Sequence, residues 1–340
     1  MEENSSDDQR ATANQTVEHR FEFRGDGFEY FKIWIVNILL TIVTLGIYSA
    51  WATVRNNRYF YSNLYLDNNN FRYLAEPLTI LKGRIIAVLA FVAYSIAAQL
   101  MPIFSLVLLL LLLVAIPFFV NQSLAFKNRM SAYRNIQFRF HGSYGEAFMV
   151  MYIWPILGVL TLGVLYPLAI KKMHEYRVRN SAYGTTQFSY EANIWDYGKI
   201  FLVILGIGVI GFAVTVGISY LMPAAAIISP ALMVFIYLAI IVFFMVKINN
   251  LFYCSAGLAN HRFGAHLTMP GMASVLLINM VLTIVTLGLY LPAAKVRMAK
   301  YMADNINLNA SGSLDNFAAA EQENVSVLGE EFGQVFDFGL

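Results

Sequence analysis

The tripeptide Thr44-Leu45-Gly46 lies late in an apolar run and occurs twice more, as Thr161-Leu162-Gly163 and Thr286-Leu287-Gly288. A basic stretch that contains tyrosine follows each copy. Residues 21–73 align without a gap with the region around the second copy, at the constant offset that separates the first two tripeptides. The third copy aligns with the first in the same way. These matches predict a protein built from internal repeats.

The composition indicates a polytopic membrane protein. Of the 340 residues, 58% are apolar and 13% are charged, and the mean hydropathy is +0.58. This is about half the charge of a soluble globular protein, and the apolar residues come in long blocks. The net charge of +2 does not indicate nucleic acid as a partner. We expect membrane lipids as partners, and the sequence identifies no protein partner.

Two pairs of apolar segments have the length of helices that cross a bilayer, about 20 residues. Met101-Pro102 and Met222-Pro223 separate the members of each pair, which are residues 85–100 with 103–120 and residues 200–220 with 225–246. Phe21-Glu22-Phe23-Arg24 alternates like a strand, and residues 64–73 resemble a β-hairpin. We therefore predict an all-α polytopic membrane protein of helical hairpins and three Thr-Leu-Gly membrane blocks, with small β-hairpin elements on the cytoplasmic face.

The repeats divide the chain into five parts. We expect a disordered N-terminal tail, two full repeat units, a truncated third unit, and an acidic C-terminal tail with a short amphipathic helix. The predicted boundaries are residues 1–20, 21–134, 135–260, 261–305 and 306–340.

The distribution of Lys and Arg favours one topology. If each Thr-Leu-Gly block enters and leaves the membrane on one face, all basic loops lie in the cytoplasm, as the positive-inside rule requires. Gly46, Gly163 and Gly288 permit the necessary break in each block. We therefore expect re-entrant blocks packed among four spans, with both termini cytoplasmic. The alternative is seven crossings, with the first two repeats inverted relative to each other.

Several motifs resemble the YjgN family of bacterial inner-membrane proteins, whose function is unknown. The residues that carry the resemblance are Phe21-x-Phe23-x-Gly25, Thr44-Leu45-Gly46-Ile47-Tyr48-x-x-Trp51, Val54-Arg55-Asn56-Asn57-Arg58-Tyr59, Leu81-Lys82-Gly83-Arg84 and Leu328-Gly329-Glu330-Glu331. The resemblance covers most of the chain. It implies a multi-pass protein of the bacterial inner membrane and assigns no catalytic residue.

Polar residues in the first and third blocks have two interpretations. Asn37 and Asn279 occupy equivalent positions, but Trp154 stands at this position in the second block. Interhelical hydrogen bonding is the structural interpretation. The functional interpretation is the polar lining of a path or headgroup pocket, formed by Asn37, Thr41, Thr44, Asn279, Thr283 and Thr286.

Basic and aromatic residues at the edges of the blocks also have two interpretations. They are determinants of topology, or they form a specific contact for anionic lipid headgroups. The candidates for headgroup contact are Trp51, Arg55, Arg58, Lys172, Arg297 and Lys300.

No motif supports catalysis. The chain has no phosphate-binding loop, metalloprotease motif or nucleophile elbow, and Cys254, His261 and His266 are too loosely spaced for a structural metal site. We therefore expect no enzyme activity, no metal and no cofactor. Two function classes are open: a transporter or channel-like protein with a path between the repeats, and a non-transporting membrane scaffold or anionic-lipid-binding protein.

Overall fold

The computed structural model describes residues 16–100, 102–221, 227 and 229–336. Within these residues, ten short strands form a closed antiparallel barrel, in which strands consecutive in the chain are neighbours and β10 closes the ring against β1. The strands are β1 (Thr16–Phe23), β2 (Leu64–Leu66), β3 (Asn69–Tyr73), β4 (Ser131–Tyr133), β5 (Ile136–Phe140), β6 (Ser181–Tyr183), β7 (Thr186–Tyr190), β8 (Ala256–Leu258), β9 (His261–Ala265) and β10 (Ile306–Ser311).

The prediction of an all-α fold with small β-hairpins is therefore wrong. The expected strand at Phe21 and the expected hairpin at residues 64–73 are present, but they belong to one barrel that runs through the whole chain. Most strands have only three to six residues, too few to show a clear period of alternation. A long helical segment also separates each hairpin from the next, so no local pattern reveals that the hairpins pair.

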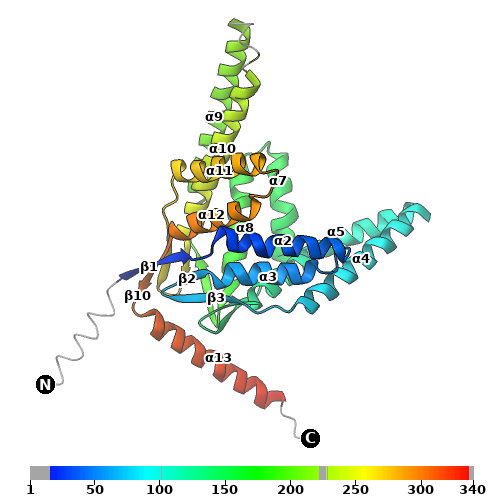
Figure 1. Cartoon of the computed structure of the whole chain (residues 1–340), viewed down its shortest axis with the longest axis vertical. Coiled ribbons are helices and arrows are strands. Elements are labelled where there is room, and N and C mark those ends of the chain that lie inside the picture. Colours follow the sequence, from blue (N-terminus) through cyan, green and yellow to red (C-terminus); the bar gives the residue numbers. More distant parts are fainter. Residues whose placement is uncertain (1–15, 101, 222–226, 228, 337–340) are drawn as a thin grey trace, which may run out of the picture.

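In the described part of the chain, the helices between the strands come in five pairs, and all five pairs leave from one end of the barrel (Figure 1). Tight turns join β2 to β3, β4 to β5, β6 to β7 and β8 to β9 at the opposite end. We call these two ends the helical end and the turn end. Each strand, helical pair and following strand form one barrel unit, numbered 1 to 5 in chain order.

The helical pairs have the following bounds. They are α2 (Gly27–Val43) with α3 (Ser49–Ser62), α4 (Pro77–Leu100) with α5 (Pro102–Arg129), α6 (Tyr144–Phe148), η1 (Met149–Ile153) and α7 (Trp154–Leu160) with α8 (Tyr166–Arg179), α9 (Ile194–Leu221) with α10 (Ser229–Cys254), and α11 (Met269–Val285) with α12 (Leu291–Asp304). A last helix, α13 (Leu314–Phe336), follows β10 at the turn end.

The Thr-Leu-Gly tripeptide is the turn between two antiparallel helices. Leu45 and Gly46 have positive φ angles of 48° and 93°, and the Gly46 amide donates to the Thr41 carbonyl at 2.8 Å, which ends α2. The Thr44 hydroxyl accepts from the Tyr48 amide at 2.9 Å and so links the end of α2 to the residue before α3. The same bonds form at the other two copies. Each block therefore turns back toward the barrel, as the re-entrant interpretation requires.

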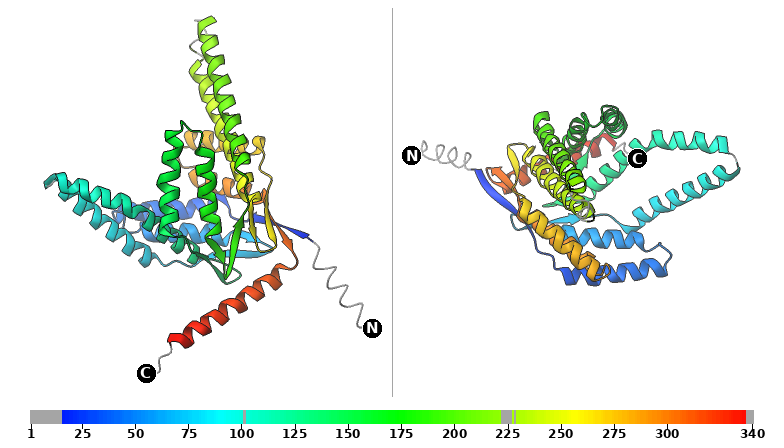
Figure 2. Two further views of the ribbon diagram at one scale, coloured as in Figure 1. Left: turned by 180° about the vertical axis from the view of Figure 1, so that it is seen from behind. Right: turned by 90° about the horizontal axis from the view of Figure 1, so that it is seen from above.

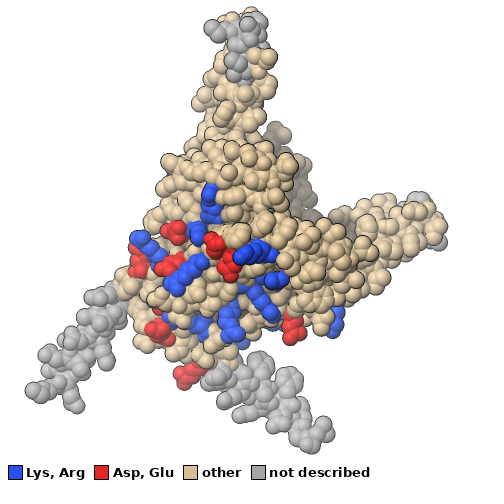
Figure 3. Space-filling view, viewed as in Figure 1, with Lys and Arg blue, Asp and Glu red and all other residues tan. Residues whose placement is uncertain are grey.

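Four helices of the described chain are long and apolar enough to cross a membrane: α4, α5, α9 and α10. The α4–α5 and α9–α10 pairs extend away from the barrel in different directions (Figures 1 and 2). Their described far parts, residues 85–100, 102–126, 200–221 and 229–246, contain no charged residue, and Figure 3 shows none on the face it presents. The expected turn residues Met101, Met222 and Pro223 lie outside the described residues.

Candidate functional site

Each barrel unit has a phenylalanine at one equivalent position of its first strand, and this side chain lines the barrel interior. It lies directly opposite an apolar or aromatic side chain of the second strand, as Phe21 lies opposite Leu66 and Phe138 opposite Tyr183. Consecutive rings from unit 1 to unit 5 have centroids 6.2 to 6.5 Å apart. These five side chains form the phenylalanine ring: Phe21, Phe71, Phe138, Phe188 and Phe263.

The phenylalanine ring separates two spaces along the barrel axis. On the helical side lie two adjoining cavities of about 420 and 370 Å³, which share Tyr61, Leu64, Tyr253 and Phe263 and together form the vestibule. On the turn side lies a lower cavity of about 260 Å³. All five phenylalanines line the lower cavity, and each also lines the vestibule. The ring is therefore the constriction between them.

The second helix of every pair lines the vestibule, and one position recurs in all five. This position lies four residues before the second strand of each unit. Units 1, 4 and 5 place an apolar side chain there, whereas the neighbouring units 2 and 3 place a cation. The five residues are Phe60, Lys127, Arg177, Phe252 and Met302.

Lys127 and Arg177 lie at the rim of the vestibule, and both side chains are exposed. Within the described residues neither forms an ion pair, although ten other ion pairs are present. Tyr61 and Ser131 also line the vestibule. The Tyr61 hydroxyl accepts a hydrogen bond from the Ser131 hydroxyl at 3.0 Å, and burial raises the pKa of Tyr61. The vestibule therefore combines an apolar wall with two adjacent, uncompensated positive charges.

The lower cavity has a wall of apolar atoms alone. Its two tyrosines direct their hydroxyls into backbone bonds, since Tyr133 donates to the Leu66 carbonyl at 2.8 Å and Tyr183 to the Tyr133 carbonyl at 3.1 Å. Burial raises the pKa of both hydroxyls, because the ionised form would lose its hydration there. This cavity can hold only apolar groups at low cost.

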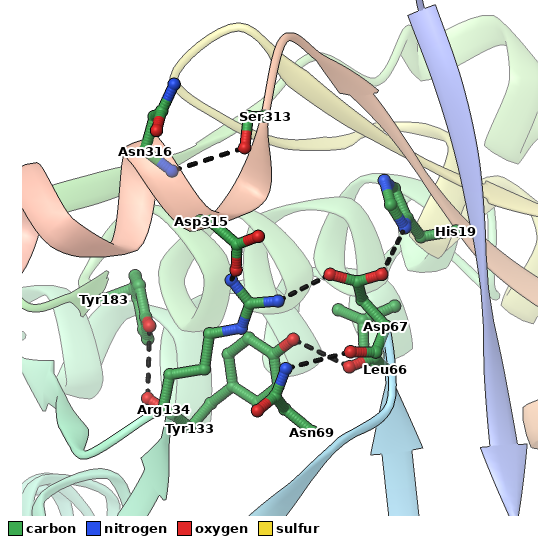
Figure 4. A network of polar contacts seen from close by, with 10 residues as sticks. All are labelled: His19, Leu66, Asp67, Asn69, Tyr133, Arg134, Tyr183, Ser313, Asp315 and Asn316. Atoms are coloured by element: carbon green, nitrogen blue, oxygen red, sulfur yellow. Dashed lines mark hydrogen bonds and ion pairs between the residues drawn. The ribbon is translucent and has the colours of Figure 1, made fainter.

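The start of α13 closes the lower cavity at the turn end. Its side chains Leu314, Phe317 and Ala318 line the cavity. Figure 4 shows how Arg134, at the β4–β5 turn, reaches between Asp67 and Asp315 and makes an ion pair of 2.5 Å with each. The Asp67 carboxylate also pairs with the His19 ring at 3.2 Å. These contacts tie the first turn of α13 to the β4–β5 turn, the β2–β3 turn and β1.

The comparison with protein families identifies the chain. Residues 18–335 match the family described as "Bacterial protein of unknown function (DUF898)". The chain belongs to this family. Two curated relatives are each named "Inner membrane protein YjgN". The one from Salmonella typhimurium is 35% identical over 134 residues, which are 38% of this chain and 33% of the relative. The one from Escherichia coli K12 is 35% identical over 127 residues, which are 37% of this chain and 32% of the relative.

The predicted resemblance to the YjgN family is thereby confirmed. The match extends over about a third of the length of these relatives. No solved structure matches the chain. The four long apolar helices of this DUF898 member fit an integral membrane protein, which agrees with the relatives' names.

The structure places the predicted polar residues inside separate helical pairs. Asn37 donates to the Asn56 side chain at 2.9 Å across α2 and α3, and Asn279 donates to the Ala294 carbonyl at 3.2 Å across α11 and α12. Thr41 donates to the Asn37 carbonyl at 2.6 Å. The hydroxyls of Thr44 and Thr286 serve the turns described above, and Thr283 provides a carbonyl to the third turn. None of these residues lines the vestibule or the lower cavity.

The predicted headgroup residues of this DUF898 member are distributed around the helical pairs. Trp51 stacks with Tyr48, and Arg297 lies over the Tyr290 ring at 5.5 Å. Arg58 donates to the Ala75 carbonyl, and Lys172 forms an ion pair with Glu175. Arg55 and Lys300 are exposed. They do not form one site, and none lines the vestibule or the lower cavity.

The sequence does contain a signal for the residues that were missed. Ser131-Ala132-Tyr133 and Ser181-Ala182-Tyr183 are identical, and Gln-Phe follows each after three residues. Aligning these two segments places Lys127 directly on Arg177. The longer offsets between the Thr-Leu-Gly copies do not produce this alignment.

Proposed function

We propose that this protein binds an anionic amphiphile from the inner leaflet of the bacterial inner membrane, without catalysing a reaction. The observation that carries the proposal is the vestibule, whose largely apolar wall includes the two cations Lys127 and Arg177, from equivalent positions of the neighbouring units 2 and 3. An anionic headgroup would replace part of the water around these cations, and hydrocarbon would cover the aromatic wall.

The position of the vestibule fits a ligand that comes from a membrane. Leu45, Leu162 and Leu287, at the tips of the three short helical pairs, are 95%, 96% and 94% exposed. Exposed apolar tips of this kind are typical of surfaces that contact lipid. The vestibule lies at the helical end of the barrel, the end from which these helical pairs leave, so a lipid could reach it along the helices.

The charge distribution supports a cytoplasmic barrel. Residues 85–126 and 200–246, which include the far parts of both spanning pairs, contain no Lys or Arg. Basic residues gather on the barrel and on the adjoining parts of the helices (Figure 3). By the positive-inside rule we place the barrel and both termini in the cytoplasm of a multi-pass inner-membrane protein. We also interpret the five barrel units as structural repeats, because they share one order of elements.

Transport of the same amphiphile is the second candidate function. One observation favours it: the vestibule and the lower cavity share one axis and meet at the phenylalanine ring. A polar path would need groups such as Asn37 and Asn279 along that axis, but both are engaged within their own helical pairs. Binding is therefore the function that the geometry supports best, and the DUF898 relatives' location in the inner membrane is consistent with it.

Native mass spectrometry of the purified full chain tests this proposal. The test variant is Lys127→Met with Arg177→Met, since unit 5 has methionine at the equivalent position. Each cation contributes about 1 kcal/mol to the binding of an anionic lipid. The loss of both should therefore weaken the retention of phosphatidylglycerol roughly thirtyfold. The control is Arg20→Gln with Lys199→Gln, which also removes two cations but leaves the vestibule unchanged, because both side chains are 73% exposed and line neither part of it. Equal retention of phosphatidylglycerol and phosphatidylcholine by the wild type would refute the proposal.

A further inference from the structure

We infer that the lower cavity is a hydrocarbon subsite, which receives the acyl chain of the amphiphile through the phenylalanine ring while the headgroup stays at Lys127 and Arg177. This inference rests on the proposed function and specifies how the ligand lies. It gives the barrel interior a role in ligand binding, which the resemblance to the YjgN family does not imply.

The two spaces adjoin at the phenylalanine ring, which an apolar chain can pass at lower cost than a polar group. Every member of the phenylalanine ring borders both spaces. A phenylalanine side chain can turn without breaking a hydrogen bond, so passage of methylene groups costs only local repacking. A charged headgroup would lose its hydration in a wall that offers no polar atom. The cations at the rim and the apolar cavity beyond the ring therefore fix the orientation of the ligand.

The chemistry of the lower cavity selects hydrocarbon as its occupant. The hydroxyls of Tyr133 and Tyr183 are already committed to backbone carbonyls, so the rings present only their apolar parts. Water in such a space would lack the two to four polar partners that hold buried water. An acyl chain instead gains from each methylene group removed from water, about 0.8 kcal/mol.

The first turns of α13 set the depth of the subsite. Leu314, Phe317 and Ala318 form its floor. The floor is held from two sides, by the ion pair of Asp315 with Arg134 and by the bonds of Glu321 with the β6–β7 turn. A fixed floor implies a longest chain that the cavity accepts, so the protein should discriminate between lipids by chain length.

Photocrosslinking tests where the chain lies. The probes are two saturated fatty acids, one with a diazirine at the terminal carbon and one with a diazirine beside the carboxylate. In the purified full chain we expect the terminal probe to label residues 314–318 and the other probe to label the segments around Lys127 and Arg177. Labelling of only the outer faces of α4 and α9 by the terminal probe would overturn the inference.

A matched pair of variants tests the floor. Ala318→Phe fills the end of the cavity, whereas Ala319→Phe places the same side chain on an exposed position of the same helix. With lysophosphatidylglycerols of increasing chain length, we expect Ala318→Phe to shift retention toward shorter chains and Ala319→Phe to retain the wild-type profile.

Unchanged chain preference in both variants would refute the inference. If retention still depended on Lys127 and Arg177 in that case, the proposed function would survive; loss of all preference for anionic lipid in the wild type would refute both.

Discussion

Glu321 of α13 accepts hydrogen bonds from Thr185 at the β6–β7 turn, 136 positions away, with the Thr185 amide at 2.7 Å and its hydroxyl at 3.0 Å. The Thr186 hydroxyl donates to the same carboxylate at 2.5 Å. The side chain of Glu321 is buried, and no cation of the described chain pairs with it. Donors from the turn thus replace the water that the carboxylate loses, which makes it a specific attachment point for α13.

The first prediction concerns this attachment. Glu321→Ala removes three hydrogen bonds and should weaken the docking of α13 by about 1 to 3 kcal/mol. Hydrogen–deuterium exchange should then accelerate in residues 314–325 while the barrel strands keep their protection. Gln322→Ala, at an exposed position beside it, is the control and should exchange like the wild type. Unchanged exchange in Glu321→Ala would mean that the apolar floor alone holds the helix.

The second prediction concerns the Thr-Leu-Gly turn. Gly46 and Gly83 both have open space where a Cβ would lie, but Gly46 has a φ of 93° and Gly83 lies within α4. Gly46→Ala should therefore destabilise the protein by about 1 to 2 kcal/mol through the left-handed backbone alone. Gly83→Ala should be neutral or stabilising, by about 0.5 to 1 kcal/mol. Thermal unfolding in detergent gives the comparison, and shifts of the same sign would contradict it.

The third prediction concerns pH. Burial, together with the nearby Arg177, lowers the pKa of His174 from 6.5 to about 4, and its ring bonds to the Tyr197 hydroxyl at 2.7 Å. Above pH 6.5 the ring is neutral in both the folded and the unfolded chain, so it adds no pH dependence. Between pH 6.5 and 4 the unfolded chain binds the extra proton, and stability should fall by up to about 3 kcal/mol as the pH decreases.

Denaturant unfolding at pH 7 and pH 4.5 measures this effect. His174→Gln loses the bond to Tyr197 at every pH, but its stability should fall less between the two pH values than that of the wild type. The control is His141→Gln, because His141 is exposed. If His174→Gln lost as much stability on acidification as the wild type, other groups would be responsible.

The parts of the fold that local chemistry specifies were predictable from the sequence. Thr44 and Gly46 carry the information for their turn within a few residues, and its recurrence indicated where the chain doubles back. The apolar runs of α4, α5, α9 and α10 identified the candidate spans by length and hydropathy. Interhelical hydrogen bonding was one of the two interpretations of Asn37, and its bond to Asn56 across α2 and α3 is of this kind, but the sequence did not identify the partner.

The barrel could not be predicted because its decisive contacts are not local. Thr16 lies opposite Ser311 in the pair of strands that closes the ring, and almost the whole chain separates them. The alignment did match Phe21 with Phe138, and Phe71 with Phe188, but as two separate sets. Only the closed barrel brings both sets into one ring, and only that ring gives Lys127 and Arg177 a common cavity.

The last prediction concerns orientation. Asn68 and Asn260 are exposed residues at two turns of the barrel's turn end, so a cytoplasmic barrel places both in the cytoplasm. Seven crossings would place them on opposite sides of the membrane. Single cysteines at these positions, in a Cys254→Ala background, should resist an impermeant thiol reagent in intact spheroplasts and react after lysis. Asn68→Cys and Asn260→Cys each test one turn of the same barrel. Labelling of only one of them in intact spheroplasts would contradict the re-entrant interpretation. It would also contradict the closed barrel, which places both turns on one side of the membrane.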